Sequence, residues 1–516
     1  MANPLYDLLF APHEGSDAPF LIQPGGAGEV SYAAFLDEAA RIADALLGLG
    51  LEPGDRVAAQ VPKSGAALAL YAGCVRAGLV FLPLNTGYTG AELDYFLENS
   101  GARVLVCDPG DAARLAEVAG RLGADLLTLG ADGQGTLTDL AEGQAGASPV
   151  ADRSLGDLAA LLYTSGTTGR SKGAMLTQEN LASNAAVLAE AWAFTAEDRL
   201  LHALPIFHTH GLFVATNVVL ATGGALILLP KFDVHAVLAE LPRATAMMGV
   251  PTFYTRLLDD PGFSAACAAH MRLFTSGSAP LLAETHRAFE ARTGQRILER
   301  YGMTETNMST SNPYRGERRP GTVGLALPGV NLRIVGKDGP VSVGEVGEIE
   351  VAGPNVFSGY WGMPEMTAAE FTEDGYFRTG DLAVQDSDGY VTIVGRSKDL
   401  IISGGYNIYP KEIEEVLDAM PGVAESAVIG VPHPDFGESP IAVVVAEPDA
   451  ILVEDDLIAR CAERLARYKH PRAVIFVSAL PRNAMGKVQK AELRRRHAGA
   501  LTGPPPSERA TALGKA

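Results

Sequence analysis

The sequence predicts an α/β protein with a large N-terminal domain of two parallel-rich sheets, a β-rich subdomain and a small, mobile α+β domain at the C-terminus. The first 400 or so residues alternate helix-period and strand-like segments, as α/β proteins do. From about residue 320, short strands alternate with Gly and Asp turns, and after Arg396 the pattern changes again. We therefore expect an N-terminal domain at 1–396, a C-terminal domain at 397–497 and a disordered tail at 498–516.

The N-terminal elements are predicted from the spacing of apolar residues and from the residues that end each segment. Residues 30–51 (VSYAAFLDEAARIADALLGLGL) begin as a strand and continue as a helix with apolar positions three and four apart. Short strands at 55–62 and 102–109 are closed by Pro or Asp-Pro. A buried strand at 158–165 is followed by a polar loop and then by a helix that Thr177 would cap.

The C-terminal elements form a smaller unit. Residues 410–420 (PKEIEEVLDAM) place Ile413, Val416, Leu417 and Met420 on one helical face. Two apolar strands, a second amphipathic helix and a third strand follow, at 424–431, 440–447, 456–468 and 472–480. The junction near 396–405 is short, so we expect a hinge rather than a long linker.

The composition limits the classes of partner that we expect this chain to bind. The net charge of −20 argues against nucleic acid or an anionic membrane surface, since both need a basic face. The apolar segment 211–230 is interrupted by Asn217 and by Gly223-Gly224, which predicts a buried helix and a strand rather than a membrane span. The four cysteines have no metal or redox spacing and are interpreted as buried thiols of a cytoplasmic protein. The partners should be small molecules, and the oligomeric state is not predicted.

The stretch LLYTSGTTGRSKGAM at 161–175 concentrates glycines, hydroxyls and a lysine after an apolar strand. Such a loop suits a polyphosphate, because bare backbone N–H groups, hydroxyls and a cation all bind anions. Its spacing differs from the usual nucleotide loop, since Lys172 is followed by Gly173. The stretch alone leaves two interpretations, another kind of phosphate loop or a flexible turn.

Further polar stretches occur where a sheet protein should be closing its strands, namely FTSGSAPL (274–281), LERYGMTETN (298–307), FRTGDLA (377–383), GRSKDLIISGGYNIYP (395–410) and LPRNAMGKVQK (480–490). Singly, each has a structural explanation as a turn or a solvated lysine, and Asp381 could cap a turn. In this order, together with YTSGTTGRSKGAM, they resemble the adenylate-forming superfamily of acyl-CoA synthetases, luciferases and peptide-synthetase adenylation domains. The resemblance covers about residues 10–497.

The resemblance implies roles for the matching residues. ATP would be bound by Thr164, Ser165, Gly166, Thr167, Thr168 and Lys172 at its phosphates, by Gly277, Ser278, Ala279, Glu299 and Tyr301 at adenine, and by Asp381, with Arg396 nearby, at ribose. Thr304 would donate to the α-phosphate and Glu305 would bind Mg²⁺. Lys487 would be the catalytic cation and Lys398 the hinge residue. The loop with Ser403, Gly404, Gly405 and Asn407 would serve coenzyme A.

The acid would be bound by 203–211 and 249–258, where the family places its acyl pocket. His208 would lie beside the reacting carboxylate, and Met303 would limit the substituent at C2; a packing histidine is the alternative for His208. If Arg256 points inward, it needs an anion, which the second carboxylate of a diacid would supply, with Ser276 adding a donor. The alternative is that Arg256 is a surface residue at a helix end. With these residues the chain is most similar to malonyl-CoA synthetases.

We therefore expect ATP- and Mg²⁺-dependent ligation of malonate to coenzyme A through an acyl-adenylate, with release of AMP and pyrophosphate and with methylmalonate as a further candidate. No general base is needed, because a carboxylate is already a nucleophile. Three alternatives stay open: a CoA ligase for another short or aromatic acid, an adenylation module that charges a carrier protein, and a regulatory protein that binds ligand without turnover.

Overall fold

The structure is a computed structural model that describes residues 2–164, 171–403, 406–433, 436–483 and 487–501. The chain divides into two compact units, unit 1 with Met1–Arg333 and Glu350–Arg378, and unit 2 with Ile334–Ile349 and Thr379–Ala516. The boundary that we expect at 396 concerns which parts rotate during catalysis, and it stays a prediction. The predicted α/β architecture with parallel-rich sheets and a C-terminal domain is confirmed.

Unit 1 contains a nine-stranded sheet in the order β15-β14-β13-β12-β11-β9-β10-β1-β2. Its strands are β1 (Pro19–Ile22), β2 (Glu29–Ser31), β9 (Arg199–His202), β10 (Ala225–Leu228), β11 (Ala246–Gly249), β12 (Leu273–Ser276), β13 (Leu298–Met303), β14 (Asn307–Ser311) and β15 (Leu325–Ala326). The run from β13 to β1 is parallel. The carboxyl ends of these parallel strands therefore meet at one edge of the sheet.

A second sheet of unit 1 has six strands in the order β6-β5-β3-β4-β7-β8. They are β3 (Arg56–Gln60), β4 (Val80–Pro83), β5 (Val104–Cys107), β6 (Asp125–Thr128), β7 (Leu158–Thr164) and β8 (Lys172–Thr177). β8 is antiparallel to β7, so the predicted order of strand, polar loop and helix is wrong by one strand. Thr177 then caps α7 (Gln178–Ala191) as predicted, accepting from the backbone N–H of Asn180.

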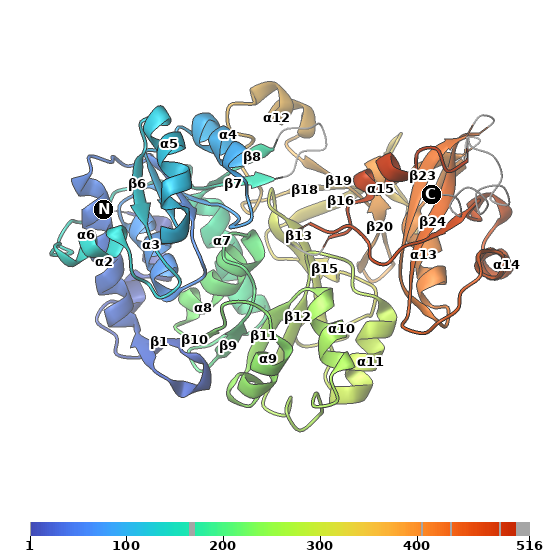
Figure 1. The fold of residues 1–516 in the computed structure, drawn as a ribbon, viewed down its shortest axis with the longest axis horizontal. Coiled ribbons are helices and arrows are strands. Elements are labelled where there is room, and N and C mark those ends of the chain that lie inside the picture. Colours follow the sequence, from blue (N-terminus) through green and yellow to red (C-terminus); the bar gives the residue numbers. More distant parts are fainter. Residues whose placement is uncertain (1, 165–170, 404–405, 434–435, 484–486, 502–516) are drawn as a thin grey trace, which may run out of the picture. The chain divides into compact units, whose positions relative to one another are not determined.

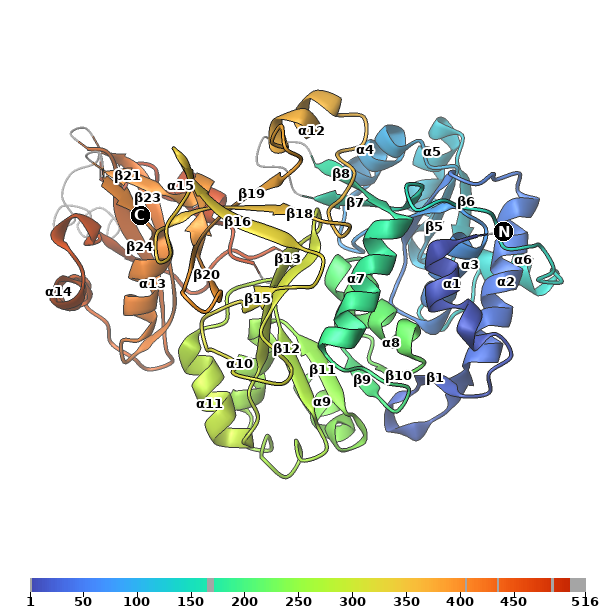
Figure 2. The same ribbon diagram turned by 180° about the vertical axis from the view of Figure 1, so that it is seen from behind.

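Helices cover both sheets, as Figures 1 and 2 show. α1 (Pro4–Leu9) contacts α3 (Gly65–Arg76), α7 and α8 (Asn217–Thr222), and α7 contacts strands of both sheets, so these helices form the layer between the sheets (Figure 2). The other helices of unit 1 are α2 (Tyr32–Gly48), α4 (Gly90–Ser100), α5 (Ala112–Leu122), α6 (Thr136–Glu142), α9 (Val234–Glu240), α10 (Pro251–Asp259), α11 (Ala283–Thr293) and α12 (Pro364–Glu370). The segment 211–230 is a buried π-helix and α8 followed by β10, in agreement with the prediction.

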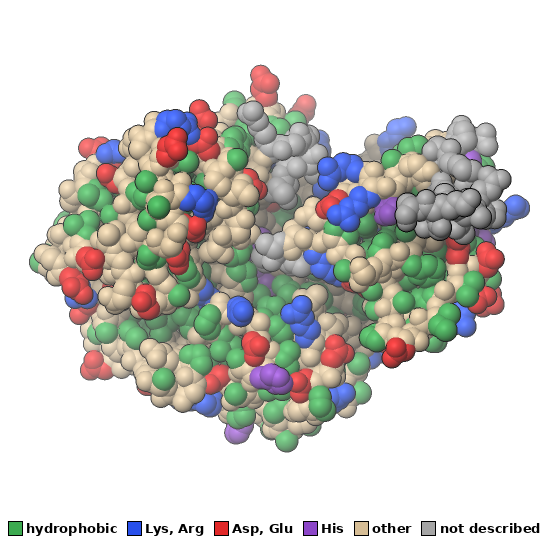
Figure 3. Space-filling view, viewed as in Figure 1, with side chains coloured by type: hydrophobic (Ala, Val, Ile, Leu, Met, Phe, Trp, Pro, Cys, Tyr) green, Lys and Arg blue, Asp and Glu red, His purple; other side chains and the backbone are tan. Residues whose placement is uncertain are grey.

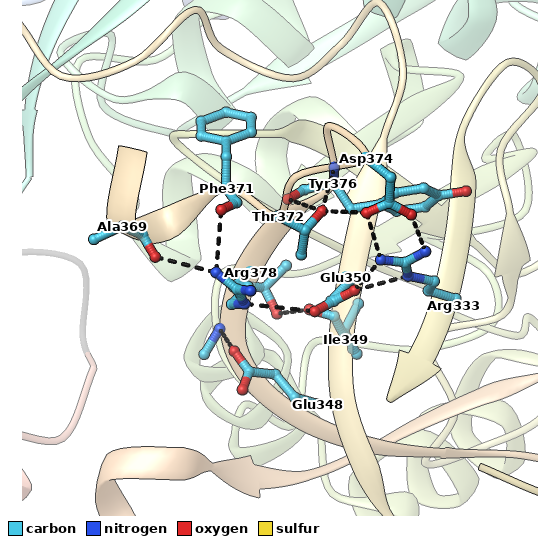
Figure 4. A network of polar contacts seen from close by, with 12 residues as sticks. Arg333, Glu348, Ile349, Glu350, Ala369, Phe371, Thr372, Asp374, Tyr376 and Arg378 are labelled. Atoms are coloured by element: carbon cyan, nitrogen blue, oxygen red, sulfur yellow. Dashed lines mark hydrogen bonds and ion pairs between the residues drawn. The ribbon is translucent and has the colours of Figure 1, made fainter. Parts of the chain in front are cut away.

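The β-rich segment forms a five-stranded sheet in the order β17-β16-β18-β19-β20. Its strands are β16 (Asn331–Gly336), β17 (Gly339–Pro340), β18 (Gly347–Ala352), β19 (Phe377–Gln385) and β20 (Val391–Arg396). Figure 4 shows Arg333 between two carboxylates, with Nε 2.7 Å from Oε2 of Glu350 and Nη1 2.6 Å from Oδ2 of Asp374. The guanidinium thereby ties β16 to β18 and to the turn before β19.

Unit 2 also holds the C-terminal α+β elements. A sheet in the order β22-β21-β24-β23, with β25 beside β24, consists of β21 (Ile401–Ser403), β22 (Tyr406–Ile408), β23 (Val423–His433), β24 (Gly437–Ala446) and β25 (Val474–Phe476). The helices are α13 (Pro410–Asp418), α14 (Glu454–Arg464) and α15 (Lys490–His497). Ile413, Leu417 and Met420 enter the core with Val428 and Val444, as the helical face at 410–420 predicts.

The surface carries charges of both signs (Figure 3), and the cysteines are free thiols. On the face in Figure 3, acidic and basic side chains are interspersed. Among the helices of the described ranges, none has both the length and the apolar character that crossing a membrane requires. The cysteines are free thiols, buried at Cys74, Cys107 and Cys461 and half-buried at Cys267.

Candidate active site

In unit 1 the candidate site lies where β12 and β13 end. The parallel pairing of Ser276 with Glu299 sets the turn after β12 beside the last residues of β13. Gly277 leaves room for the side chain of Arg300, since a Cβ at 277 would lie 2.4 Å from Cζ of that arginine. Gly302 permits an even closer approach, because a Cβ there would lie 1.8 Å from the carbonyl oxygen of Asn307. Gly302 is therefore required by packing against the backbone, whereas Gly277 leaves space that the end of the Arg300 side chain occupies.

A serine and a histidine are held together beside this turn. Ser278 has a left-handed backbone with φ of 69°, and its Oγ lies 3.1 Å from Nδ1 of His210. Strain of this kind is often found at functional sites. His210 begins a π-helix (His210–Thr216), a form that also recurs at such sites. Burial and the charge of Arg300 hold the pKa of His210 well below its usual range, so the imidazole is neutral.

His208, which we predict beside the reacting carboxylate, is half-buried, with its ring centroid 6.4 Å from that of Phe207. The sequence-based prediction passed over His210, the more deeply buried histidine of the same loop. The two histidines differ in burial, and the sequence His208-Thr209-His210 does not reveal which of them is the more deeply buried.

Tyr360, which we did not predict as a site residue, contacts both Lys172 and Glu305. The Lys172 ammonium lies 4.6 Å from the ring centroid of Tyr360, whose hydroxyl donates to Oε1 of Glu305 at 3.1 Å. Lys172 also pairs with Glu370 at 3.3 Å. The predicted phosphate-binding cation and the predicted metal ligand thus share one neighbour.

The remaining nucleotide residues of unit 1 are placed as follows. Thr164 ends β7 opposite Lys172. Tyr301 lies within β13, and Thr304 lies in the turn between β13 and β14. Glu299 is buried, with Oε1 3.2 Å from both Nδ1 of His286 and the backbone N–H of Gly321, so its proposed contact with adenine stays a prediction. Ser165, Gly166, Thr167, Thr168, Gly404 and Gly405 lie outside the described residues.

Arg256 is exposed in the last turn of α10. Tyr254 and Leu257 occupy the buried face of this short helix, and a residue two positions after Tyr254 points to the opposite side. Arg256 is thus an exposed residue near a helix end, and its proposed contact with the second carboxylate stays a prediction.

Ser276 and Met303, the other predicted acid-binding residues, differ in accessibility. Ser276 is 1% exposed and shares its face of β12 with Phe274, which packs against Phe289 in the core. Met303 ends β13 and is half-buried. Alternation along β12 thus turns Ser276 away from the face on which Gly277 meets Arg300.

Arg300 has the most unusual environment of the charged residues at these strand ends. Its side chain is buried, at 3% exposure, beside Gly277. Nε and Nη2 have no hydrogen-bond partner within the described ranges. Burial lowers the pKa of this guanidinium to about 9.

In unit 2 three predicted residues lie together. Asp381 is not in a turn, as we expected, but within β19, where it pairs with Arg396 of β20. Its Oδ1 accepts from Nε of Arg396 at 2.7 Å. Near this pair, desolvation of the Lys487 ammonium and the charge of Arg396 lower the pKa of Lys487 to about 8.

The predicted hinge and coenzyme A residues follow β20. Lys398 lies in a single 3₁₀ turn, Ser397–Asp399, directly after that strand. Ser403 ends β21 and is buried, whereas Asn407 lies on β22 and is exposed. Their roles stay predictions.

The donor set fits Mg²⁺ bound largely by substrate and water. No group of three or more His, Cys, Asp or Glu side chains placed to hold a metal occurs in the described part of the chain. Mg²⁺ commonly uses one or two carboxylates, with phosphate oxygens and waters as its other ligands. The buried carboxylate of Glu305 fits that requirement.

Comparisons with known proteins show the family of this chain. Residues 11–361 match the AMP-binding enzyme family, and residues 412–487 match the AMP-binding enzyme C-terminal domain. The crystal structure of ATP-bound MatB from Rhodopseudomonas palustris shares 54% identity and a TM-score of 0.95, covering 97% of this chain and 100% of that one.

Curated relatives act on different acids. A sulfoacetate–CoA ligase of Cupriavidus necator is 38% identical over 92% of this chain and 94% of its own length. A feruloyl-CoA synthase of Amycolatopsis is 41% identical over 91% and 94%, and a malonate–CoA ligase of Arabidopsis thaliana 36% over 87% and 79%. This chain therefore belongs to the AMP-binding enzyme family and is an AMP-forming acyl-CoA ligase.

Proposed function

We propose that this ligase joins malonate to coenzyme A, with methylmalonate as a second candidate substrate. In the first half-reaction a malonate carboxylate attacks the α-phosphorus of ATP, forming malonyl-adenylate and releasing pyrophosphate. In the second, the coenzyme A thiolate attacks the acyl carbon and AMP leaves. The first step joins two anions, so its barrier is largely electrostatic.

The residues of this chain supply the positive charge that the first step needs. Lys172 would hold the terminal phosphates, and Lys487 would neutralise charge that develops on the α-phosphate. Glu305 would hold Mg²⁺, which supplies further charge neutralisation when it is bound. Asp381 would accept from the ribose hydroxyls, with its position fixed by Arg396.

We choose malonate because polar residues gather where β12 and β13 end. Arg300, His210 and Ser278 lie near one another there, and the arginine and histidine are deeply buried. Such surroundings suit a small acid with a second anionic group and do not suit a long aromatic acid. Malonate and sulfoacetate both carry such a group one carbon from the reacting carboxylate, and both are substrates named for relatives.

A panel of acids tests the proposal. Pyrophosphate release should be fastest with malonate and slower with propionate, butyrate, benzoate and ferulate, and the malonyl thioester should form only when coenzyme A is present. Preferred turnover of benzoate or ferulate would contradict the choice of malonate. Adenylation without transfer to coenzyme A would favour charging of a carrier protein instead.

A further inference from the structure

Lys487 lies in a loop of unit 2 whose two ends run side by side. The backbone N–H of Gln489 donates to the carbonyl oxygen of Pro481 at 2.8 Å. Arg482 and Val488 form an antiparallel bridge one step further along the loop. These backbone contacts close the base of the loop, from which Lys487 projects.

Lys487 is joined to the opposite side of this loop by two reciprocal hydrogen bonds. The backbone N–H of Asn483 donates to the carbonyl oxygen of Lys487 at 2.9 Å. The backbone N–H of Lys487 donates in turn to Oδ1 of Asn483 at 2.9 Å. Because Lys487 is tied in this way to the residues that form the base, the placement of the base determines the placement of Lys487.

Each end of the loop carries a cation that pairs with an acid of the neighbouring elements. After the loop, Lys490 begins α15, and its Nζ lies 2.6 Å from Oε1 of Glu414 on α13. The same oxygen accepts from the backbone N–H of Val428 on β23 at 2.7 Å. Before the loop, Arg482 pairs with Glu425 on β23. The two ion pairs thus attach both ends of the loop to α13 and β23.

The pair of Lys490 and Glu414 is well sheltered from water. Their side chains are 18% and 16% exposed, so loss of the cation would leave a largely buried carboxylate without its charge partner. The next acid of α13, Glu415, differs in both respects. It lies 3.7 Å from Lys411, and its side chain is 58% exposed. Exposed pairs of this kind contribute little to stability, so Glu415 provides a matched control on the same helix.

Apolar packing holds the same elements together without orienting the loop. Leu480, before the loop, and Leu493, in α15, are buried in one core with Ala427 and Ile429 of β23. Contacts of this kind are non-directional. A short, charge-assisted hydrogen bond constrains both distance and direction. The two ion pairs therefore add an orientation that the core does not supply.

We propose that the pair of Glu414 and Lys490 positions the Lys487 ammonium for adenylation. The pair of Arg482 and Glu425 does the same from the other end of the loop. A preorganised cation acts only if it is held where charge develops, and a displacement of about 1 Å can cost about 10²-fold in rate. This inference rests on the proposed role of Lys487 and does not depend on which acid the enzyme prefers.

Lys490→Met tests the assignment, because it removes the charge and keeps most of the length of the side chain. Pyrophosphate release in a single turnover should fall by about 10–10²-fold. Thioester formation from supplied acyl-adenylate should stay at the wild-type rate, since that step does not require Lys487. Lys490→Arg keeps the charge and should retain most of the adenylation rate. Glu415→Gln should leave both steps unchanged.

A double variant separates positioning from a general structural role. If Lys490 acts through Lys487, adding Lys490→Met to Lys487→Ala should lower adenylation no further than Lys487→Ala alone does. Losses that multiply in the double variant, or an equal loss in both half-reactions of Lys490→Met, would overturn the assignment. If Lys490→Met fails to fold, Arg482→Gln at the other end gives the same test, and wild-type adenylation in that variant would overturn the assignment as well.

Lys487→Ala alone separates this inference from the function proposed above. If Lys487→Ala forms the adenylate at the wild-type rate, the proposed role of Lys487 is wrong and the positioning role falls with it. If Lys487→Ala fails in adenylation while Lys490→Met keeps the wild-type rate in both steps, only the positioning role is overturned.

Discussion

Replacing Lys487 should affect one half-reaction and not the other. Lys487→Ala removes a preorganised cation from the transition state of adenylation, which costs about 3–4 kcal/mol, or roughly 10²–10³ in rate. Transfer of the acyl group from supplied malonyl-adenylate to coenzyme A should be retained, because that step does not require charge neutralisation at the α-phosphate by this lysine. Pyrophosphate release in a single turnover and thioester formation from the adenylate measure the two steps separately.

The surroundings of Lys487 add a pH dependence. With a pKa of about 8, the ammonium is protonated below that pH and loses its charge as the pH rises through it. The protonated fraction falls from about 0.9 at pH 7 to about 0.1 at pH 9, so adenylation should slow about tenfold over this range. Lys487→Arg keeps its charge throughout and should remove this alkaline loss, whatever its absolute rate.

Two results would refute this reasoning. If Lys487→Ala slows both half-reactions equally, the residue supports the fold or the binding of nucleotide rather than adenylation. If Lys487→Arg shows the same alkaline loss as the wild type, another group controls the pH profile. Thermal unfolding of each variant serves as the control for folding.

Three further predictions concern the hinge, the metal and the fold. Lys398→Pro fixes φ in the turn after β20 and should block thioester formation while single-turnover pyrophosphate release is retained; wild-type speed in both steps would place the hinge elsewhere. Tyr360→Phe removes the hydrogen bond to Glu305 and should raise the Mg²⁺ concentration for half-maximal rate about tenfold, whereas an unchanged requirement would argue against Glu305 as the ligand. Arg272→Leu leaves Asp198 buried without its cation and should lower the free energy of unfolding by about 3–5 kcal/mol, measured in urea; a change under about 1 kcal/mol would show that the pair is well solvated.

Much of the fold could be predicted because local patterns determine it. The amphipathic period at 30–51, the cap at Thr177 and the interrupted apolar run at 211–230 each depend on residues a few positions apart, and each has the predicted structure. The errors occur where two strands or residues that pair in the fold cannot be recognised as partners from the local sequence. The sequence of 172–177 does not reveal that this segment pairs back on β7 as β8. Asp381 lies in a stretch that is typical of turns, and only the sheet places Arg396 opposite it.

The two arginines show why the acid site was harder to predict than the nucleotide site. A nucleotide loop is contiguous, so its glycines, hydroxyls and lysine can be recognised in a single stretch. Residues far apart in the sequence, such as His210 and Ser278, come together only in the fold, so the surroundings of an acid cannot be recognised in one stretch. Arg256 stood out because it interrupts an apolar stretch, yet α10 turns it to solvent. Arg300 lies between Glu299 and Tyr301, and only alternation along β13, the bare backbone of Gly277 and the lack of a described counter-charge distinguish it from an ordinary strand residue.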